Sequence, residues 1–373
     1  MKFVVDSKIP FIKGVLEKKG IEVLYLEPAK IAKESVKDAD GLIIRTRTKC
    51  NETLLEGTNV KFIATATIGF DHIDTNYCRK KDIFWTNAPG CNSSSVAQYI
   101  CSAILNWALS VEKELKGLNI GIIGVGNVGS KVAKVSEILG MQTLLNDPPR
   151  EEKEGKKNFV PLKTILEEAD IITIHVPLEY EGVHKTFHFA NDNFFSEIRK
   201  KPLFINSSRG EVVDSIALKK AISQNLISSA IIDVWENEPN IDRELLKLAK
   251  FATPHIAGYS TDGKANGTAM SIRAASRFFK LGLDDWYPDN IPLPENYRLN
   301  LSSSGFQFIA DAVNSSYDIR KDDSALRESP ESFENLRGKY PLRREFNAFE
   351  IDALGQSPKI INQLTELGFK INI

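Results

Sequence analysis

The first 90 residues alternate between short apolar runs and longer stretches in which apolar residues recur at helical spacing. Each run has the length of a buried strand, and most gaps between runs leave room for a helix. Strand–helix alternation of this kind predicts a parallel sheet covered on both faces. The expected strands are residues 3–5, 23–26, 42–44, 62–66 and 83–85.

A second alternation starts at residue 119, after a turn signal at 87–90 and a small, apolar helical stretch at 94–109. Its six apolar runs, separated by helical stretches, match a doubly wound sheet that binds a nucleotide. Ligands of such sheets lie at the carboxyl ends of the strands, so polar residues at those ends are candidate functional residues. The runs are residues 119–123, 141–146, 170–175, 203–207, 230–234 and 251–253.

The pattern changes after residue 260. Residues 261–281 have helical spacing, and this helix is expected to fold back onto the first domain, which makes that domain discontinuous. Residues 287–295 are Pro-rich and predict an extended linker. The remainder has an apolar stretch at 306–313, a charged middle and a helix–strand pattern at 359–373. A protein interface is the preferred interpretation. A small autonomous domain and a flexible tail are the alternatives, and the apolar stretches argue against a tail.

The strand at 119–123 runs into a glycine-rich turn that opens a helical stretch. Gly124, Gly126 and Gly129 have the spacing G-x-G-x-x-G, which permits a tight turn, close approach of a pyrophosphate and close packing of the helix. The helix N-terminus adds N–H donors and partial positive charge for the phosphates. Asp147, after the next strand, is placed to hold the ribose hydroxyls and would repel a 2′-phosphate. This context favours NAD binding over an ordinary strand–helix turn.

Composition limits the expected partners. The 373 residues allow two or three domains, and 42% hydrophobic residues are typical of a globular protein. With 48 basic and 49 acidic residues, the net charge of −1 gives no sign of a nucleic acid or membrane partner. We expect neither a signal peptide nor a membrane span. The four cysteines form no CxxC pair, so free thiols and a cytoplasmic location are expected.

Three polar residues after the later strands can carry chemistry. Arg209 has a planar guanidinium that can grip a carboxylate and a carbonyl oxygen together; a surface arginine that caps a turn is the alternative. Glu238 and His255 follow strands of the same sheet, and a carboxylate beside an imidazole fixes its tautomer and stabilises the imidazolium. Such a pair can move a hydroxyl proton while hydride goes to nicotinamide. Glu236 is the rival partner of His255.

The other four histidines are weaker candidates. His72 is expected to order a turn, and His175, at a strand end, either lines the cofactor site or is structural. His184 and His188 have the four-residue spacing of zinc ligands on a helix. No third ligand lies nearby in the sequence, so no metal site is expected.

Cations and hydroxyls that follow two strands of the first domain are candidate anion ligands. Arg45, Arg47 and Lys49 follow one strand, and the segment 65–69 with two threonines follows another. If the backbone stays extended, Arg45 and Arg47 share one face and Thr46 takes the other. A solvated charge cluster is the alternative for Arg47 and Lys49.

Together these motifs resemble those of the D-isomer-specific 2-hydroxyacid dehydrogenases. The set is GVGNVG, then Asp147, NSSRGEVVD, DVWENEP and TPHIAGYS, in the family's order. A branch of the family that acts on a phosphorylated sugar acid is also similar in VVDSKIP, IIRTRTKCNETLL, ATATIGFDHID, APGCN, NDPPR, YDIRKDD and YPLRREF. The resemblance implies NAD-dependent oxidation of 4-phospho-D-erythronate to 3-hydroxy-2-oxo-4-phosphooxybutanoate, in pyridoxal 5′-phosphate (vitamin B6) biosynthesis.

The resemblance also implies an architecture. It consists of two doubly wound parallel-sheet α/β domains, a flavodoxin-like substrate domain and a Rossmann NAD domain, plus a small α+β C-terminal domain. The expected boundaries are 1–95 with 259–285 for the substrate-binding (lid) domain, 96–258 for the NAD-binding domain and 286–373 for the dimerisation domain. A homodimer is therefore expected, and Arg343 and Arg344 are candidates to reach the active site of a neighbouring subunit.

Site residues follow from the matched positions. Catalysis is assigned to Arg209, Glu238 and His255. Substrate contacts are assigned to Arg45, Thr46, Thr67 and Tyr259. Ser208, directly before Arg209, and Arg47 in the substrate loop depart from the family pattern. The candidate cofactor-binding residues are Gly124, Gly126, Asn127, Val128, Gly129, Asp147, His175, Val176, Ser207, Ser208, Asp233 and Gly258.

Two other functions compete with this one. A dehydrogenase for another phosphorylated 2-hydroxy acid, such as 3-phosphoglycerate, would share every catalytic residue, and only the C-terminal region favours the erythronate substrate. An NAD-sensing, corepressor-like binding protein is the alternative from a different class. The complete set of Arg209, Glu238 and His255, with no basic or disordered arm, argues against the second alternative.

Overall fold

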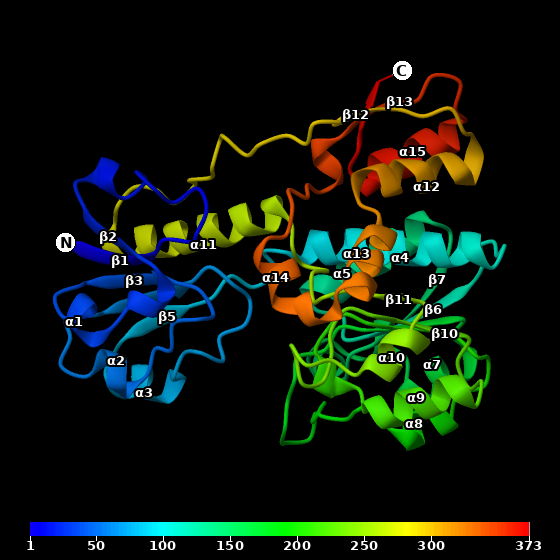
Figure 1. Cartoon of the computed structure of the whole chain (residues 1–373), viewed down its shortest axis with the longest axis horizontal. Helices are drawn as coiled ribbons and strands as arrows, with labels where there is room; N and C mark the ends of the chain where they lie inside the picture. The colour runs from blue at the N-terminus through cyan, green and yellow to red at the C-terminus, as the bar shows by residue number, and fades with distance from the viewer. Residues whose placement is uncertain (373) are drawn as a thin grey trace. The chain divides into compact units, whose positions relative to one another are not determined.

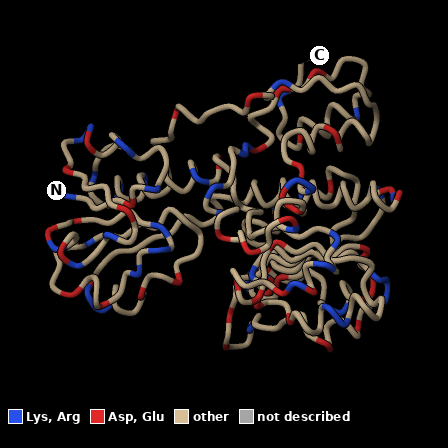
Figure 2. Tube along the Cα trace, viewed as in Figure 1, with Lys and Arg blue, Asp and Glu red and all other residues tan. Residues whose placement is uncertain are grey.

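Parallel sheets organise both compact units of the chain (Figure 1). The computed structural model describes residues 1–372, apart from the side chain of Lys156. One unit comprises Met1–Asn92 and Ser260–Pro292, and the other comprises Ser93–Tyr259 and the residues from Leu293 onward. Basic and acidic residues are interspersed in both units (Figure 2). Among the described residues, no helix has the length and apolar character needed to cross a bilayer.

The first unit contains a five-stranded sheet in the order β2-β1-β3-β4-β5, with every pairing parallel. This is the flavodoxin-like doubly wound order, so the expected fold of this part is confirmed. Each strand ends within one residue of its expected position, because the apolar runs are short and bounded by polar residues. The strands are β1 (Lys2–Asp6), β2 (Glu22–Leu26), β3 (Gly41–Ile44), β4 (Phe62–Thr65) and β5 (Phe84–Thr86).

One long helix and several short ones accompany this sheet. The long helix, α11, starts after Ser260, whose side chain caps it by accepting a hydrogen bond from Gly263 N at 2.8 Å. It contacts β4, and its Phe279 packs against Phe3 and Phe62, so the chain returns to its first unit as the sequence predicts. The helices are α1 (Lys33–Val36), α2 (Glu52–Leu55), α3 (Thr75–Lys80) and α11 (Thr261–Phe279).

The second unit contains a six-stranded sheet in the order β11-β10-β9-β8-β6-β7, again parallel throughout. The strand order reverses between β6 and β8, which is where open α/β sheets bind ligands. Because all strands run the same way, the residues that follow them lie along one edge. The strands are β6 (Asn119–Ile123), β7 (Gln142–Asn146), β8 (Ile171–Ile174), β9 (Leu203–Asn206), β10 (Ser229–Ile232) and β11 (Phe251–Ala252).

Helices cover both faces of this sheet (Figure 1). Successive strand residues therefore alternate between two cores: Ile205 joins the core with α4 and α5, and Phe204 joins the core with α7, α9 and α10. Almost every residue of α4 is buried, which explains its apolar sequence. The helices are α4 (Ser93–Ser110), α5 (Asn127–Ile138), α6 (Pro148–Glu154), α7 (Leu162–Glu168), α8 (Asp192–Ser196), α9 (Ser215–Ser223) and α10 (Arg243–Leu248).

The C-terminal region packs into the second unit. Its sheet, in the order β12-β13-β14, is parallel, and its helices continue the core: α12 contacts α4, α13 contacts β11 and α15 contacts α5. The division into three domains stays a prediction. The elements are β12 (Arg298–Asn300), α12 (Gly305–Ser316), α13 (Ile319–Glu328), α14 (Phe333–Gly338), β13 (Glu350–Asp352), α15 (Pro358–Leu367) and β14 (Lys370–Asn372).

Arg343 and Arg344 do not point outward, so the idea that they reach a neighbouring subunit's site is wrong. They are only 5% and 7% exposed. Arg343 donates to Gln98 Oε1 at 3.0 Å and to the Ser95 carbonyl oxygen at 2.6 Å within its own unit.

Candidate active site

The glycine loop after β6 has the geometry of a pyrophosphate cradle. Gly124 has φ +86°, and a Cβ there would lie 2.7 Å from the backbone of His175. A Cβ at Gly129 would lie 2.0 Å from the Gly124 carbonyl oxygen, so α5 packs directly on the loop. Beside Gly126 a Cβ would meet nothing within 4 Å, and no side chain caps α5 there. This open space, next to the N–H groups of the first turn with Asn127, fits an anionic pyrophosphate.

Asp147 follows β7 beside this loop, where a ribose ligand is expected. Its carboxylate accepts hydrogen bonds from Val125 N at 2.8 Å and from Arg150 N at 3.1 Å. The first bond ties the glycine loop to β7, and the second makes Asp147 the N-cap of α6. The Arg150 guanidinium also donates to the Val125 carbonyl oxygen. Since each carboxylate oxygen can accept a further bond, the arrangement fits two ribose hydroxyls.

The ends of β8 and β9 provide further cofactor candidates. Val176 packs against the glycine loop, and burial lowers the pKa of His175 to about 3, so that ring is neutral at pH 7. The Ser207 hydroxyl is buried without a hydrogen-bond partner among the described residues. A bound ligand could supply the missing hydrogen bond. Ser208 differs, because its N–H and hydroxyl both donate to Asn206 Oδ1, at 3.1 and 2.9 Å.

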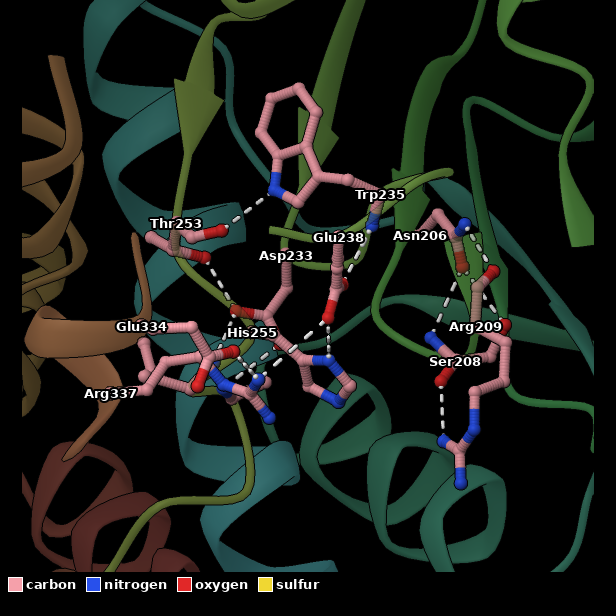
Figure 3. Close-up of polar contacts among 12 residues, drawn as sticks. Asn206, Ser208, Arg209, Asp233, Trp235, Glu238, Thr253, His255, Glu334 and Arg337 are labelled. Carbon is pink, nitrogen blue, oxygen red and sulfur yellow. Dashed lines mark hydrogen bonds and ion pairs between the residues drawn. The ribbon is translucent and has the colours of Figure 1, made fainter. Parts of the chain in front are cut away.

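Arg209 lies in a tight turn after β9. Asn206 Nδ2 donates to the Arg209 carbonyl oxygen at 3.0 Å, and the guanidinium donates to the Ser208 carbonyl oxygen at 2.7 Å (Figure 3). A Cβ on Gly210 would lie 2.0 Å from the backbone of Trp235. Glycine is therefore needed for this turn to approach the loop after β10, which carries the acid of the site.

Replacing Gly210 with alanine is expected to lower the free energy of unfolding by about 1–3 kcal/mol and to reduce kcat/KM, because the added methyl group pushes Arg209 away from its position. Thermal unfolding and initial rates measure the two effects. Gly338→Ala is the matched control, since a Cβ at Gly338 meets nothing within 4 Å. Equal unfolding temperatures for the two variants would contradict the close contact.

His255 pairs with Glu238. Its Nδ1 lies 2.8 Å from Glu238 Oε2, and Glu238 Oε1 accepts from Trp235 N at 3.0 Å (Figure 3). Because a carboxylate only accepts, Nδ1 carries the hydrogen, and Nε2 of the neutral ring is left as a proton acceptor. Burial would raise the pKa of Glu238, but the bond and charge of His255, the Trp235 N–H and the charge of Arg337 together lower it. The carboxylate is therefore ionised at neutral pH.

Asp233 fixes the backbone that carries His255. Its carboxylate accepts from the Thr253 hydroxyl at 2.7 Å, from Ile256 N at 2.8 Å and from Ala257 N at 3.0 Å. His255 has φ +55°, a conformation that costs energy for a residue other than glycine. The Asp233 bonds on both sides of His255 hold this conformation. All these bonds are internal to the protein, so a direct contact of Asp233 with NAD stays a prediction, as does the contact of Gly258.

Glu236 has a different partner. Its Oε1 lies 2.7 Å from His188 Nε2, and its Oε2 accepts from Ser215 N at 2.9 Å. His184 and His188 lie in turns, and Lys185 and Thr186 between them belong to no helix or strand, so the four-residue spacing does not place the two rings on one helix face. No cluster of three or more metal-ligating side chains occurs in the described part of the chain. Glu236 and His188 thus support the loop structurally.

The substrate candidates lie in different environments. The chain turns after β3, where Thr48 N donates to the Arg45 carbonyl oxygen at 3.2 Å, so the backbone is not extended and the condition for Arg45 and Arg47 to share one face is not met. Arg45 is half-buried and Thr46 is exposed. The Thr67 hydroxyl donates to Gly69 O at 3.1 Å. Tyr259 belongs to the second unit, where its ring meets that of Tyr340 edge-on at 5.8 Å.

His72 orders a turn, as predicted. Its Nε2 lies 3.1 Å from Thr65 Oγ1, and burial lowers its pKa. One residue near the acid was missed: Arg337 of α14, whose Nη1 is 3.9 Å from Glu238 Oε2. No local motif marks Arg337. The one signal in the sequence is that the segment 333–339 contains two basic residues, Arg337 and Lys339.

Two sequence families match the chain. The D-isomer specific 2-hydroxyacid dehydrogenase NAD binding domain matches residues 103–257, and a domain of unknown function matches residues 291–368. The first match spans the whole edge that holds the glycine loop, Arg209, Glu238 and His255. NAD is therefore the cofactor that this part of the chain binds.

Similar proteins cover nearly the whole chain. The erythronate-4-phosphate dehydrogenase of Bacteroides thetaiotaomicron is 54% identical over 94% of this chain and 99% of its own. That of Porphyromonas gingivalis is 40% identical over 94% of this chain and 95% of its own.

Solved structures show the same fold. NAD-bound 3-phosphoglycerate dehydrogenase of Entamoeba histolytica has a TM-score of 0.62 at 27% identity, covering 78% of this chain and 99% of its own. D-lactate dehydrogenase of Aquifex aeolicus, complexed with NAD and lactic acid, has a TM-score of 0.60 at 27% identity, covering 76% and 96%. The chain therefore belongs to the erythronate-4-phosphate dehydrogenases, within the D-isomer specific 2-hydroxyacid dehydrogenase family.

Proposed function

We propose that the chain oxidises 4-phospho-D-erythronate to 3-hydroxy-2-oxo-4-phosphooxybutanoate with NAD, a step of pyridoxal 5′-phosphate biosynthesis. The observation that carries the chemistry is the 2.8 Å pairing of His255 Nδ1 with Glu238 Oε2 at the strand ends beside Arg209. A proton acceptor, its carboxylate and a guanidinium are what oxidation of a 2-hydroxy acid needs. The choice of substrate is supported by the 54% identical relative.

The chain's own residues divide the work as follows. Arg209 orients the substrate carboxylate and polarises the C2 oxygen. Nε2 of neutral His255 takes the C2 hydroxyl proton, and Glu238 stabilises the imidazolium that results. Bound NAD supplies the hydride acceptor. The glycine loop and Asp147 would hold its two phosphates and adenosine ribose, and Val176 would line the nicotinamide half.

A substrate panel tests this function. NADH formation from 4-phospho-D-erythronate is expected at a kcat/KM about 100-fold above that for 3-phosphoglycerate, since an enzyme built for one acid discriminates against an imperfect fit. A higher rate with 3-phosphoglycerate would reassign the substrate. Tight NAD binding without turnover of any hydroxy acid would instead favour an NAD-sensing binding protein.

We also propose that Arg45 and Lys264, with Thr46 and Thr67 of the same unit, bind the charged end of the substrate; the substrate contact of Tyr259 stays a separate prediction. Burial, and then the charge of Arg45, lower the pKa of Lys264, so two cations face a common environment in the first unit. Like charges held together favour an anionic ligand.

Arg45→Gln is expected to raise KM for the phosphorylated acid by about 10-fold or more, with a smaller change in kcat, because the lost contact is made in ground and transition states alike. Lys49→Gln, an exposed cation of the same loop, serves as the control and is expected to behave like wild type. Equal KM values for both variants would count against Arg45.

The C-terminal region, residues 286–373, is proposed to form a homodimer. The sheet of β12, β13 and β14 buries Leu299 and Ile351 on one face, whereas Arg298, Asn300 and Asp352 lie on the other. Parallel sheets are normally covered on both faces, and a second copy would cover the open face. Sedimentation of Leu354→Asp, at a residue 78% exposed beside this face, is expected to show dissociation. Val183→Asp, at a residue 95% exposed elsewhere, is the control.

A cytoplasmic location is proposed from the cysteines. All four, Cys50, Cys78, Cys91 and Cys101, are free and buried. Burial raises the pKa of Cys101 and Cys50, which keeps both as unreactive thiols. Free thiols are usual in a reducing compartment.

A further inference from the structure

The C-terminal region reaches the backbone next to the catalytic histidine. Arg343 Nη1 donates to the carbonyl oxygens of Ile256 and Ala257, each at 3.2 Å, directly after His255. Its guanidinium lies 3.7 Å from the centre of the Tyr317 ring, which holds the side chain in one orientation. The region matched by a family of unknown function is therefore joined to the segment that carries the base.

A second arginine of this region reaches the acid. Arg337, on α14, places Nη1 3.9 Å from Glu238 Oε2 and 3.0 Å from Glu334 Oε1 (Figure 3). It also lies over the rings of Tyr259 and Phe333, each at 5.8 Å. Phe333 is fully buried, so α14 is anchored at its first residue. The position of Arg337 is thus fixed by packing and not only by charge.

The contact of Arg337 is with the same oxygen that binds the imidazole. Glu238 Oε2 accepts from His255 Nδ1 at 2.8 Å, and Arg337 approaches that oxygen from α14. Arg337 Nε is buried without a hydrogen-bond partner among the described residues. Hydrogen bonding of this nitrogen therefore does not explain the position of the guanidinium. Arg337 is half-buried, and a cation so close to the Glu238–His255 pair acts on both members through its charge.

We propose that Arg337 is a positioning residue for the Glu238–His255 pair: it holds the Glu238 carboxylate and opposes the charge of the imidazolium, so that the C-terminal region sets the pH range in which His255 works as a base. This inference rests on the role of His255 in the proposed function. It gives the C-terminal region a part in catalysis besides the proposed dimer contact.

The sign of the effect follows from the charges around the pair. The charged and titratable groups are Asp233 after β10, whose pKa is raised by burial, Arg337 and, beside Arg337, Glu334 and Tyr259. A positive charge near His255 disfavours its protonated form. The same charge of Arg337 also attracts the Glu238 carboxylate, which weakens the stabilisation of the imidazolium by that carboxylate. Both effects act against formation of the imidazolium. Removing the charge of Arg337 should therefore let His255 keep its proton to higher pH.

The test is the pH profile of kcat/KM for oxidation in the full-length protein. Arg337→Gln is expected to move the acidic limb upward by about 1 pH unit, and Arg337→Lys, which keeps the charge, by much less. The affinity for NADH, measured by fluorescence, is expected to stay within about twofold of wild type. Proton titration of the His255 ring, followed by NMR without cofactor and assigned with His255→Gln, should shift in the same direction.

Arg327→Gln is the matched control. Arg327, on α13, also fixes the C-terminal region to the second unit, by donating to the carbonyl oxygens of Leu246 and Ala249 at 2.7 and 2.8 Å. Its removal is expected to lower the unfolding temperature while leaving the pH profile in place. The control therefore distinguishes a shift of the pH profile caused by loss of the Arg337 charge from one caused by weaker packing of the C-terminal region.

Two outcomes would overturn the inference. One is an Arg337→Gln profile and His255 titration that superimpose on those of wild type. The other is a rise in KM for the acid with an unchanged profile, which would make Arg337 a substrate contact. Inactivity of the wild type toward every acid of the panel would remove the proposed function alone, because the NMR titration still decides whether Arg337 acts on His255.

Discussion

Replacing His255 with alanine is expected to lower kcat by about 10⁴-fold, to the limit of detection, while changing NAD affinity little. The reason is chemical: the proposed acceptor of the hydroxyl proton is removed, and general bases contribute up to about that factor. The cofactor loop lies after β6 and β7, and it is held by Asp147 and not by His255. Initial rates and fluorescence titration with NADH measure the two quantities.

The left-handed conformation of His255 makes a second variant useful. At φ +55° asparagine is tolerated better than alanine, so His255→Asn removes the base with less backbone strain. His188→Asn is the matched control, because His188 also has positive φ, +50°, and also pairs with a carboxylate, that of Glu236 at 2.7 Å. The control is expected to keep kcat within about tenfold of wild type. Near-normal turnover of His255→Ala would show that another group takes the proton.

Local chemistry explains why the cofactor loop could be predicted. Gly124 needs positive φ, and Gly129 touches the loop itself, so each glycine is required by contacts within a few residues. Strand positions in both sheets follow for the same reason, since each apolar run is buried between neighbouring strands. The sequence preferred Glu238 as the acid but left Glu236 open as its rival, and the structure bears out the pairing of Glu238 with His255. Glu236 and Glu238 are two residues apart, and the left-handed Asn237 between them, with φ +61°, directs their side chains to different histidines.

Long-range packing explains what the sequence did not reveal. Arg337 meets Glu238 only because α13 packs on β11 and brings α14 to the strand ends. Nothing in the residues around Arg337 encodes that contact, and the same holds for Arg343 and the carbonyl oxygen of Ile256. The prediction that the C-terminal region is an interface used its apolar stretches and its charged middle, and neither feature indicates which residue an arginine contacts. The structure shows that Arg337 and Arg343 contact residues of their own unit.

Replacing Arg209 with glutamine is expected to lower kcat/KM by about 10²–10³-fold, comparable to the loss of a group that stabilises developing charge on a substrate oxygen. The turn should survive the change, because Asn206 binds the main-chain carbonyl of Arg209 and Gly210 packs on the backbone of Trp235, neither through the guanidinium. The loss would therefore report the side chain itself, and NADH affinity and unfolding temperature are expected to stay near wild type.

Arg209→Lys separates charge from geometry. Lysine restores a positive charge but cannot bind a carboxylate and a carbonyl oxygen through one planar fork, so it is expected to recover about a tenth of the lost activity. Stopped-flow measurement of the burst of NADH, with the erythronate and with a shorter 2-hydroxy acid, shows whether the chemical step is the one slowed. Full recovery by lysine would mean that charge alone suffices at this position. A glutamine variant as active as wild type would return Arg209 to the alternative of a surface arginine that caps a turn.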